Sequence, residues 1–313
     1  MNDRQANYKT CVILPCLNEG VAIAKVISDF RSALPHATIY VIDNNSDDNT
    51  SQCAKEAGAV VISEMIRGKG NAIRRAFSEI DADIFVMADG DGTYDSSRAA
   101  EMIELLIQDN LDMIVAVRKE KTQTAYRFGH KFGNQLFNFL FRKLFGNQFT
   151  DIFSGYRVFS RRYIKSFPAL SSGFEIETEM NTHAIQLNLP VAEIETEYQA
   201  RSSGSLSKLR TLQDGFRIFL YIIYFLKQLR PFSLFFTIAI VFALVSILLG
   251  FPVIWTFIET GLVPRLPTAI AAASLMVIAV VSLATGLILD NISVLQWEQK
   301  RLQYLSTEKF CNK

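Results

Sequence analysis

The sequence predicts an α/β protein that carries two membrane-spanning helices towards its carboxyl end. Over roughly the first 200 residues, short runs rich in Val and Ile alternate with longer segments whose apolar residues recur every three or four positions. Further on, two long runs contain no charged residue. Half of the 313 residues are hydrophobic and one fifth are charged, with 32 Lys and Arg against 31 Asp and Glu. This balance excludes a disordered protein and gives no basic excess for binding nucleic acid.

The alternating part predicts a mostly parallel sheet covered by helices on both faces. The predicted strands are Thr10 to Pro15, Thr38 to Asp43, Val60 to Ser63, Ile84 to Asp89 and Met113 to Val117. The predicted helices between them are Asn18 to Ala33, Asp47 to Ala57, Gly70 to Ile80 and Ser96 to Gln108.

The two uncharged runs, Pro231 to Ile258 and Leu266 to Leu289, are 28 and 24 residues long. Each exceeds the roughly 18 apolar residues that indicate a membrane-spanning helix, and neither shows the polar stripe of a core helix in a soluble protein. We therefore expect the segments 1–204 (α/β domain), 205–230 (amphipathic helix), 231–258 (first span), 259–265 (turn), 266–289 (second span) and 290–313 (tail).

Positive charge flanks the predicted hairpin on one side. Lys227 and Arg230 precede the first span, Lys300 and Arg301 follow the second, and Arg265 alone lies in the turn. This bias predicts that the α/β domain and both termini are cytosolic. Leu and Phe at helical spacing in 205–230 fit a helix lying in the membrane interface or, equally by periodicity, one packed on the domain.

Ligands of an open parallel sheet bind at the carboxyl ends of its strands. Asn18 and Ser46 follow the first two predicted strands and could contact a ligand or cap the next helices. Asp43 ends a buried strand and has no such capping role, so a ligand hydroxyl would satisfy its carboxylate. Lys69 lies between two glycines at the start of a helix, an arrangement that suits a phosphate group but is a weak indication alone.

Asp89 and Asp91 end the fourth predicted strand. In extended chain their carboxylates point the same way, roughly 6 to 7 Å apart, and such like charges need a cation between them. Mg²⁺ or Mn²⁺ fits, because these ions prefer carboxylate oxygen and bring a diphosphate with them. The alternative is a glycine-rich turn in which aspartates stabilise bends and cap a helix at 95–97.

The order of these motifs resembles the family 2 glycosyltransferases, and among them the polyprenyl-phosphate sugar transferases similar to dolichol-phosphate mannose synthase. The resemblance rests on Val12-Ile13-Leu14-Pro15 with Asn18-Glu19, Ile42-Asp43 with Ser46 to Thr50, Arg67-Gly68-Lys69-Gly70, Asp89-Gly90-Asp91, Asp151 to Arg157, Gly173 to Glu179, and Arg201 with Ser207-Lys208-Leu209. It implies that residues 1–204 form a catalytic domain with the GT-A nucleotide-diphospho-sugar transferase fold. As in the anchored bacterial members, a transmembrane hairpin would follow, so we expect the protein at the inner membrane of a bacterium.

The resemblance also implies site residues. Pro15, Glu19 and Asp43 would hold the nucleoside, with Asp89 on the nucleotide side of the site. Asp91, with Asp89 beside it, would hold the metal ion on the donor diphosphate. Many relatives place a glutamine ligand where this chain has Thr93, so water or a hydroxyl group would replace one ligand.

Basic residues are expected to bind the acceptor phosphate. By resemblance these are Arg118, Arg127 and Lys131, although a solvated basic face would show a similar cluster. Asp151 would orient the nucleophile or a basic partner. Because some relatives carry an acidic residue where this chain has Gly155, both roles stay open.

The expected activity is inverting, metal-dependent transfer of a sugar from a UDP- or GDP-sugar to polyprenyl phosphate at the cytosolic membrane face. The alternatives are a family 2 transferase acting on a glycolipid or polysaccharide, and a non-catalytic membrane adaptor that binds nucleotide sugar. The expected partners are therefore a nucleotide diphosphate sugar, polyprenyl phosphate and the lipid bilayer, and no nucleic acid. A homo-oligomer is left open, and so is the identity of the sugar.

Overall fold

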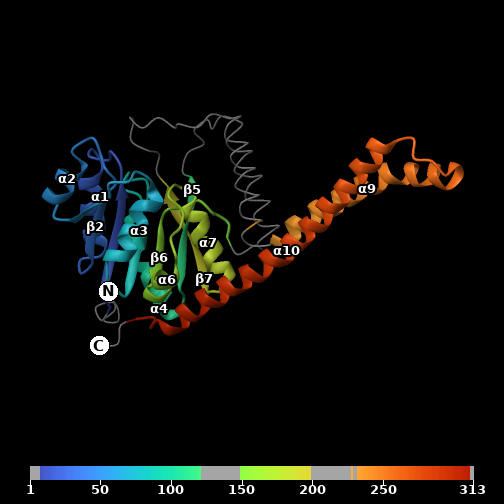
Figure 1. Cartoon of the computed structure of the whole chain (residues 1–313). Coiled ribbons are helices and arrows are strands. Elements are labelled where there is room, and N and C mark those ends of the chain that lie inside the picture. Colours follow the sequence, from blue (N-terminus) through green and yellow to red (C-terminus); the bar gives the residue numbers. More distant parts are fainter. Residues whose placement is uncertain (1–7, 121–148, 199–226, 228–230, 311–313) are drawn as a thin grey trace. The chain divides into compact units, whose positions relative to one another are not determined.

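The computed structural model describes residues 8–120, 149–198, 227 and 231–310 (Figure 1). The chain divides into two compact units, and each is treated by itself. The first comprises residues 1–211 and 300–313, and the second comprises residues 212–299. The predicted amphipathic helix at 205–230 lies outside the described residues, apart from Lys227.

Within the described residues, seven strands form one mixed sheet in the order β3-β2-β1-β4-β6-β5-β7. The strands are β1 (Thr10–Cys16), β2 (Thr38–Asp43), β3 (Val60–Ser63), β4 (Ile84–Met87), β5 (Met113–Glu120), β6 (Arg157–Ser160) and β7 (Val191–Tyr198). The first four are parallel to one another, as are β5 and β7, whereas β6 runs antiparallel to both of its neighbours.

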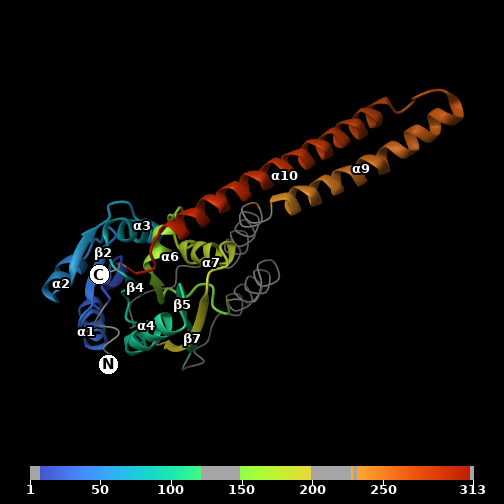
Figure 2. The ribbon, with the colours of Figure 1, turned by 90° about the horizontal axis from the view of Figure 1, so that it is seen from below.

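Helices cover both faces of this sheet (Figure 2). They are α1 (Ile23–Ala33), α2 (Thr50–Glu56), α3 (Lys69–Glu79), the 3-10 turn Ser96–Arg98, α4 (Ala99–Gln108), α6 (Arg161–Ser166) and α7 (Ile176–Gln186). Helices α1 and α4 pack on one face and α3, α6 and α7 on the other, so the strands need apolar side chains on both sides. Val12 and Leu14 accordingly belong to the α1–α4 core, and Ile13, between them in the strand, is equally buried.

The sheet extends beyond the five strands predicted from the sequence. Strand β6 is only four residues long and begins with the fully buried Arg157. A charged first residue in so short a run hides the strand from a hydrophobicity pattern. Its antiparallel insertion between β4 and β5 makes the sheet mixed, which is consistent with the prediction of a mostly parallel one.

The end of the described chain packs on the base of the first unit. Tyr304, only 5 % exposed, donates a hydrogen bond to the buried Asp112 at 2.7 Å. Asp112 also receives two hydrogen bonds from Arg162, at 2.8 and 2.9 Å. Further on, the rings of Phe310 and Tyr8 lie 4.5 Å apart. Segment 300–310 thus closes the domain at the edge opposite the carboxyl ends of its parallel strands.

The second unit is a hairpin of two long apolar helices. Helix α9 spans Pro231–Thr260, and α10 spans Leu266–Ser306, which continues well past the predicted end of the second span at Leu289. Both are long and apolar enough to cross a membrane. In the most apolar stretch of each helix, only 11% (α9) and 17% (α10) of the residues are buried. Ser246 of α9 donates a hydrogen bond to the Ala272 carbonyl of α10 at 2.7 Å.

Small residues line the contact between α9 and α10. Those buried in α9 recur every seven residues, and α10 shows the same spacing: Ala239, Ser246 and Val253 on α9, and Ala272 and Ala279 on α10. A repeat of seven is typical of two helices that wrap around each other with a continuous seam. The seam accounts for most of the burial in the hairpin, and the remaining apolar surface faces outwards.

Candidate active site

The first part of the site lies where β1 and β2 end side by side, with Cys16 paired to Asp43. Pro15 is buried in β1, and Glu19 follows in the next loop, with its backbone amide bonded to the Thr50 hydroxyl at 2.8 Å. Asp43 is 9% exposed, and one of its oxygens accepts a hydrogen bond from the Ser46 amide at 3.2 Å. The structure thus brings the three predicted nucleoside residues to one edge of the sheet.

The loops after β1 and β2 bind each other. The Asn18 amide donates to the Ser46 hydroxyl at 3.0 Å, and the Asn18 side-chain oxygen accepts from the Asp47 amide at 2.7 Å. Asn18 adopts φ of 57°, a left-handed conformation that asparagine tolerates. Neither Asn18 nor Ser46 caps a helix, since α1 and α2 begin several residues later without a side-chain cap. Their role is to hold the two loops together.

Asp89 lies beyond the end of β4, where it meets Lys69 from the first turn of α3. The Lys69 ammonium forms ion pairs with Asp89 and with Glu177 of α7, the latter at 2.6 Å. Burial alone would lower the pKa of Lys69, but the negative charges of Asp89 and Glu177 outweigh it and raise that pKa. Lys69 is therefore positively charged at neutral pH.

Asp91 is held by its own turn. Its Oδ1 accepts hydrogen bonds from the Thr93 amide at 3.1 Å and from the Thr93 hydroxyl at 2.7 Å. Asp91 is 8% exposed and Thr93 1%. Asp95 caps the following turn by accepting from the Ser97 amide, as the turn interpretation expected for that residue.

A divalent cation fits these carboxylates only with help from the substrate. In the part of the chain that the structure describes, no cluster of three or more His, Cys, Asp or Glu side chains is close enough to hold a metal ion. Asp89 already compensates a lysine, whereas Asp91 is oriented by neutral donors. Two carboxylates supplemented by diphosphate oxygens and water is a common way to bind Mg²⁺. The donor set therefore suits an ion that arrives with a nucleotide.

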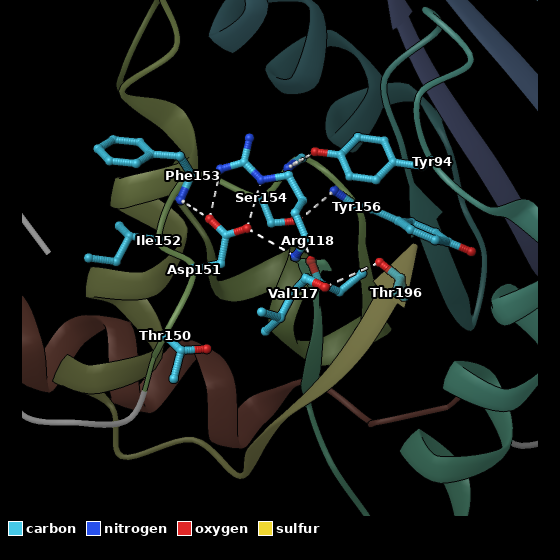
Figure 3. A network of polar contacts seen from close by, with 12 residues as sticks. Tyr94, Val117, Arg118, Thr150, Asp151, Ile152, Phe153, Ser154, Tyr156 and Thr196 are labelled. Atoms are coloured by element: carbon cyan, nitrogen blue, oxygen red, sulfur yellow. Dashed lines mark hydrogen bonds and ion pairs between the residues drawn. The ribbon is translucent and has the colours of Figure 1, made fainter. Parts of the chain in front are cut away.

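Arg118 and Asp151 form a two-pronged ion pair (Figure 3). Arg118 Nε lies 2.7 Å from Asp151 Oδ2, and Nη2 lies 2.8 Å from Oδ1. Arg118 belongs to β5, and its side chain is 28% exposed. The planar guanidinium matches the carboxylate, so Asp151 fixes the orientation of Arg118. Of the two roles left open for Asp151, orienting a basic partner is the one for which the structure supplies a contact.

The buried Arg157 holds the segment that carries Asp151 by hydrogen bonds. Arg157 donates to the carbonyl oxygens of Ser154 at 2.9 Å and Ile152 at 3.1 Å, and to Asn181 of α7 at 2.6 Å. Burial lowers the pKa of Arg157, and three well-placed acceptors compensate its charge. This arginine shapes the site without reaching it.

Gly155 lies directly against the Asp89 and Lys69 side chains. A Cβ at this position would stand 2.8 Å from Asp89 Oδ2 and 2.9 Å from Lys69 Nζ. The Gly155 amide donates to the Tyr94 hydroxyl at 2.9 Å. Glycine permits this close approach, and any larger side chain at this position would displace the Asp89–Lys69 ion pair.

Two predicted phosphate-binding residues, Arg127 and Lys131, lie outside the described residues. In the other direction, sequence reasoning missed Glu177, the inner partner of Lys69. Helical periodicity was the available indication: residues two apart on a helix face nearly opposite ways. Glu175 and Glu179 are both partly exposed, and the residue midway between them therefore points inwards.

The family model described as Glycosyl transferase family 2 matches residues 11–167, which is half of the chain. The chain belongs to the family 2 glycosyltransferases. The matched region contains the carboxyl ends of strands β1 to β6 but not that of β7.

Relatives of this family 2 glycosyltransferase include a protein of nearly equal extent. Glycosyltransferase AglJ of Haloferax volcanii is 32% identical over 301 residues, covering 94% of this chain and 97% of that one. Dolichyl-phosphate hexose transferase of the same organism is 30% identical over 110 residues, covering 35% of this chain and 48% of that one.

Solved structures confirm the predicted GT-A fold. Glucosyl-3-phosphoglycerate synthase from Mycobacterium tuberculosis, crystallised with Mn²⁺, UDP-glucose and phosphoglyceric acid, superimposes with a TM-score of 0.57 at 20% identity. The superposition covers 70% of this chain and 80% of that one. At this identity the similarity concerns the fold alone.

Proposed function

We propose that this family 2 glycosyltransferase moves a sugar from a UDP- or GDP-sugar to polyprenyl phosphate, with inversion and with Mg²⁺ or Mn²⁺. The observation that carries the proposal is the gathering of Asp43, Asp89, Asp91 and Arg118 at one end of the sheet, in a chain that also has two long apolar helices. The acidic groups suit a cation and a nucleotide, and the arginine suits a second anion.

The nucleotide would lie across the ends of β1, β2 and β4. Pro15, Glu19 and Asp43 would contact the nucleoside, and Asp89 and Asp91 the diphosphate end, in line with ligand binding where parallel strands end. When bound, a divalent cation would neutralise charge on the leaving diphosphate. Asp91 is the residue best placed to hold it.

The acceptor step needs positioning more than proton removal. A phosphate monoester has a second pKa of about 6, so its attacking oxygen is anionic at neutral pH. What the protein must supply is a fixed positive charge that brings this anion close to another. Arg118, locked by Asp151 at 2.7 and 2.8 Å, provides such a charge, and Arg127 and Lys131 are proposed to add to it.

The apolar hairpin supports a lipid acceptor. A polyprenyl chain leaves the bilayer only at a cost of about 0.8 kcal/mol per methylene, so the enzyme must work at the membrane. One relative is named for transfer of hexose to dolichyl phosphate, a polyprenyl phosphate. The basic flanks of α9 and α10, with a single arginine between them, support a cytosolic catalytic domain.

The test is product formation by the full-length protein in detergent. A panel of radiolabelled UDP-glucose, UDP-galactose, UDP-N-acetylglucosamine and GDP-mannose is offered with undecaprenyl phosphate and Mg²⁺ or Mn²⁺. One donor should yield a label that extracts into organic solvent, and EDTA should abolish it. Asp91→Asn should lower turnover by about a hundredfold or more, because it removes the carboxylate proposed to hold the cation.

Asp95→Asn is the matched control, since Asp95 lies in the same turn but only caps Ser97. It should keep turnover within about twofold. Label that appears only on added glycolipid or polysaccharide would refute the polyprenyl phosphate acceptor. Donor binding without any product would identify a nucleotide-sugar-binding adaptor instead.

A further inference from the structure

Glu177 is buried beneath the proposed donor site in a way that the reaction described above does not use. It lies in the first turn of α7, and its side chain is 4% exposed. Oε1 pairs with Lys69 at 2.6 Å, and Oε2 has no hydrogen-bond partner among the described residues. Leaving a carboxylate oxygen buried and unsatisfied costs free energy, so stability alone does not explain why an acid occupies this position.

The charges form a graded row from the interior to the surface. Glu177 is innermost, Lys69 is 10% exposed, and Asp89 is 28% exposed. Burial raises the pKa of Glu177, and the adjacent Lys69 charge acts against that rise. The lysine is thereby fixed between a hidden partner and an accessible one, and the row ends at the proposed diphosphate position.

Neighbouring groups leave Lys69 little freedom. Gly155 approaches Nζ so closely that even a Cβ there would be only 2.9 Å away. On another side, the ring of Phe174 has its centroid 5.7 Å from Nζ. An ammonium group has three N–H donors, and Asp89 and Glu177 account for two.

We propose that Glu177 is a positioning residue that fixes the Lys69 ammonium beside Asp89, so that its third N–H is presented to the sugar-diphosphate end of the donor. This inference rests on the proposed nucleotide-sugar donor. The Lys69 ammonium lies against Asp89, which follows β4, and Gly155, which precedes β6, whereas Pro15 and Asp43 lie in β1 and β2 and Glu19 in the loop after β1. Their effect should therefore concern the sugar-diphosphate end and spare the nucleoside.

The test compares binding of a free nucleotide that lacks the second phosphate and the sugar with binding of the sugar nucleotide. Calorimetry on the full-length protein in detergent, with Mn²⁺, measures UMP against UDP-glucose, UDP-galactose and UDP-N-acetylglucosamine, and GMP against GDP-mannose. For the sugar nucleotide that the wild type binds, Glu177→Gln should weaken affinity about tenfold, because Lys69 loses its inner charge partner. Affinity for the free nucleotide should stay within about twofold.

Two variants separate positioning from folding. Asp112→Asn neutralises a different buried carboxylate, which pairs with Arg162 at the opposite end of β5. It should change the affinity for neither the free nor the sugar-bearing nucleotide. The double variant Lys69→Met with Glu177→Leu removes both charges, and apolar replacement of a buried ion pair is often neutral for stability. It should unfold near the wild-type temperature yet bind the sugar nucleotide as weakly as Glu177→Gln.

Equal weakening of free and sugar-bearing nucleotide by Glu177→Gln, or no weakening of either, would overturn the inference. So would wild-type affinity in the double variant. These measurements need no acceptor, so a wild type that binds UDP-glucose but does not glycosylate undecaprenyl phosphate refutes the proposed acceptor alone. A wild type that binds none of the four sugar nucleotides overturns both proposals.

Discussion

Buried polar side chains in the catalytic domain differ in how well they are satisfied. Asp112 is fully buried, and hydrogen bonds from Arg162, Ser160 and Tyr304 outweigh the effect of burial, so that its pKa is lowered. His183 of α7 is also buried, but only its Nε2 has a partner, the Ser166 hydroxyl at 3.0 Å. Burial lowers the pKa of His183 from 6.5 to about 3. His183 is therefore neutral in the folded protein at any moderate pH.

Stability should consequently fall with acidification through His183. Unfolded, the imidazole binds a proton below pH 6.5, while the folded protein excludes that proton until about pH 3. The stabilising contribution is thus complete above 6.5 and is lost progressively as pH falls towards 3. Between pH 7.5 and pH 5 the free energy of unfolding should drop by about 2 kcal/mol.

Denaturant unfolding of the full-length protein in detergent at both pH values measures this drop. His183→Gln should remove most of it, and His36→Gln, at an exposed position, should leave it in place. Equal wild-type stability at pH 7.5 and pH 5 would contradict a neutral, buried His183.

Single residues of the site were predictable where a motif and a strand end coincide. Asp43, Asp89 and Asp91 follow buried strands, so their position at one edge of the sheet follows from sequence. Their partners do not. Lys69 and Glu177 are 108 positions apart and meet only because α3 and α7 cover the same face of the sheet. Contacts between distant segments leave no local pattern in the sequence. The one local indication was Glu177, a charged residue on the inward face of α7.

At the level of elements, the parallel half of the sheet was predictable and the antiparallel insertion was not. Strands β1 to β3 have the predicted beginnings and nearly the predicted ends, because Val- and Ile-rich runs between helical segments are distinctive. Strand β6 begins with Arg157, whose charge is satisfied by Ser154, Ile152 and Asn181. Tertiary hydrogen bonds therefore overrode the local preference against a buried arginine.

The seam of the apolar hairpin gives an element-scale prediction. A Cβ on Gly286 would lie 2.9 Å from the Cβ of Phe235, whereas a Cβ on Gly250 would lie 3.5 Å from that of Ala272, an ordinary contact. Gly286→Ala should therefore push α9 and α10 apart and lower hairpin stability by about 1 kcal/mol or more. Gly250→Ala, the matched change, should be neutral or stabilising.

Cysteine cross-linking across the seam provides the measurement. With Ala239→Cys and Ala279→Cys as reporters of the seam, Gly286→Ala should slow disulfide formation in membranes and Gly250→Ala should not. Identical rates in both backgrounds would mean that the helices do not pack along this seam.

At the scale of the whole molecule, the catalytic domain is completed by the end of α10, from Lys300 on, and by the residues after it. Besides Tyr304, the Arg301 guanidinium donates to the Leu187 carbonyl at 3.1 Å, and Lys300 donates to Gln186 at 3.1 Å. Lys309 contacts Asn110 at 2.7 Å. The sequence predicted only a tail over 290–313, because nothing in its composition marks a docking segment.

Removing the Tyr304 hydroxyl should weaken the packing of segment 300–310 on the domain. Tyr304→Phe keeps the ring between Arg162 and Arg301 but deletes its hydrogen bond to the charged Asp112. The free energy of unfolding should fall by about 2 kcal/mol, the range for hydrogen bonds to buried charges. Thermal unfolding of the full-length protein measures the change. Tyr40→Phe is the control, because the Tyr40 hydroxyl has no hydrogen bond to the described residues, and it should leave the midpoint unchanged.

The contact between Tyr304 and Asp112 joins positions 192 apart, with α9 and most of α10 translated in between. The ribosome therefore synthesises α9 and most of α10 before it adds Tyr304, the residue that completes the hydrogen bonds of Asp112. Until then Asp112 lacks the hydrogen bond from Tyr304, and we expect the nascent domain to be less stable than the finished one. Biogenesis is thus ordered by connectivity: synthesis of the apolar hairpin comes first, and the last contacts of the catalytic domain form afterwards.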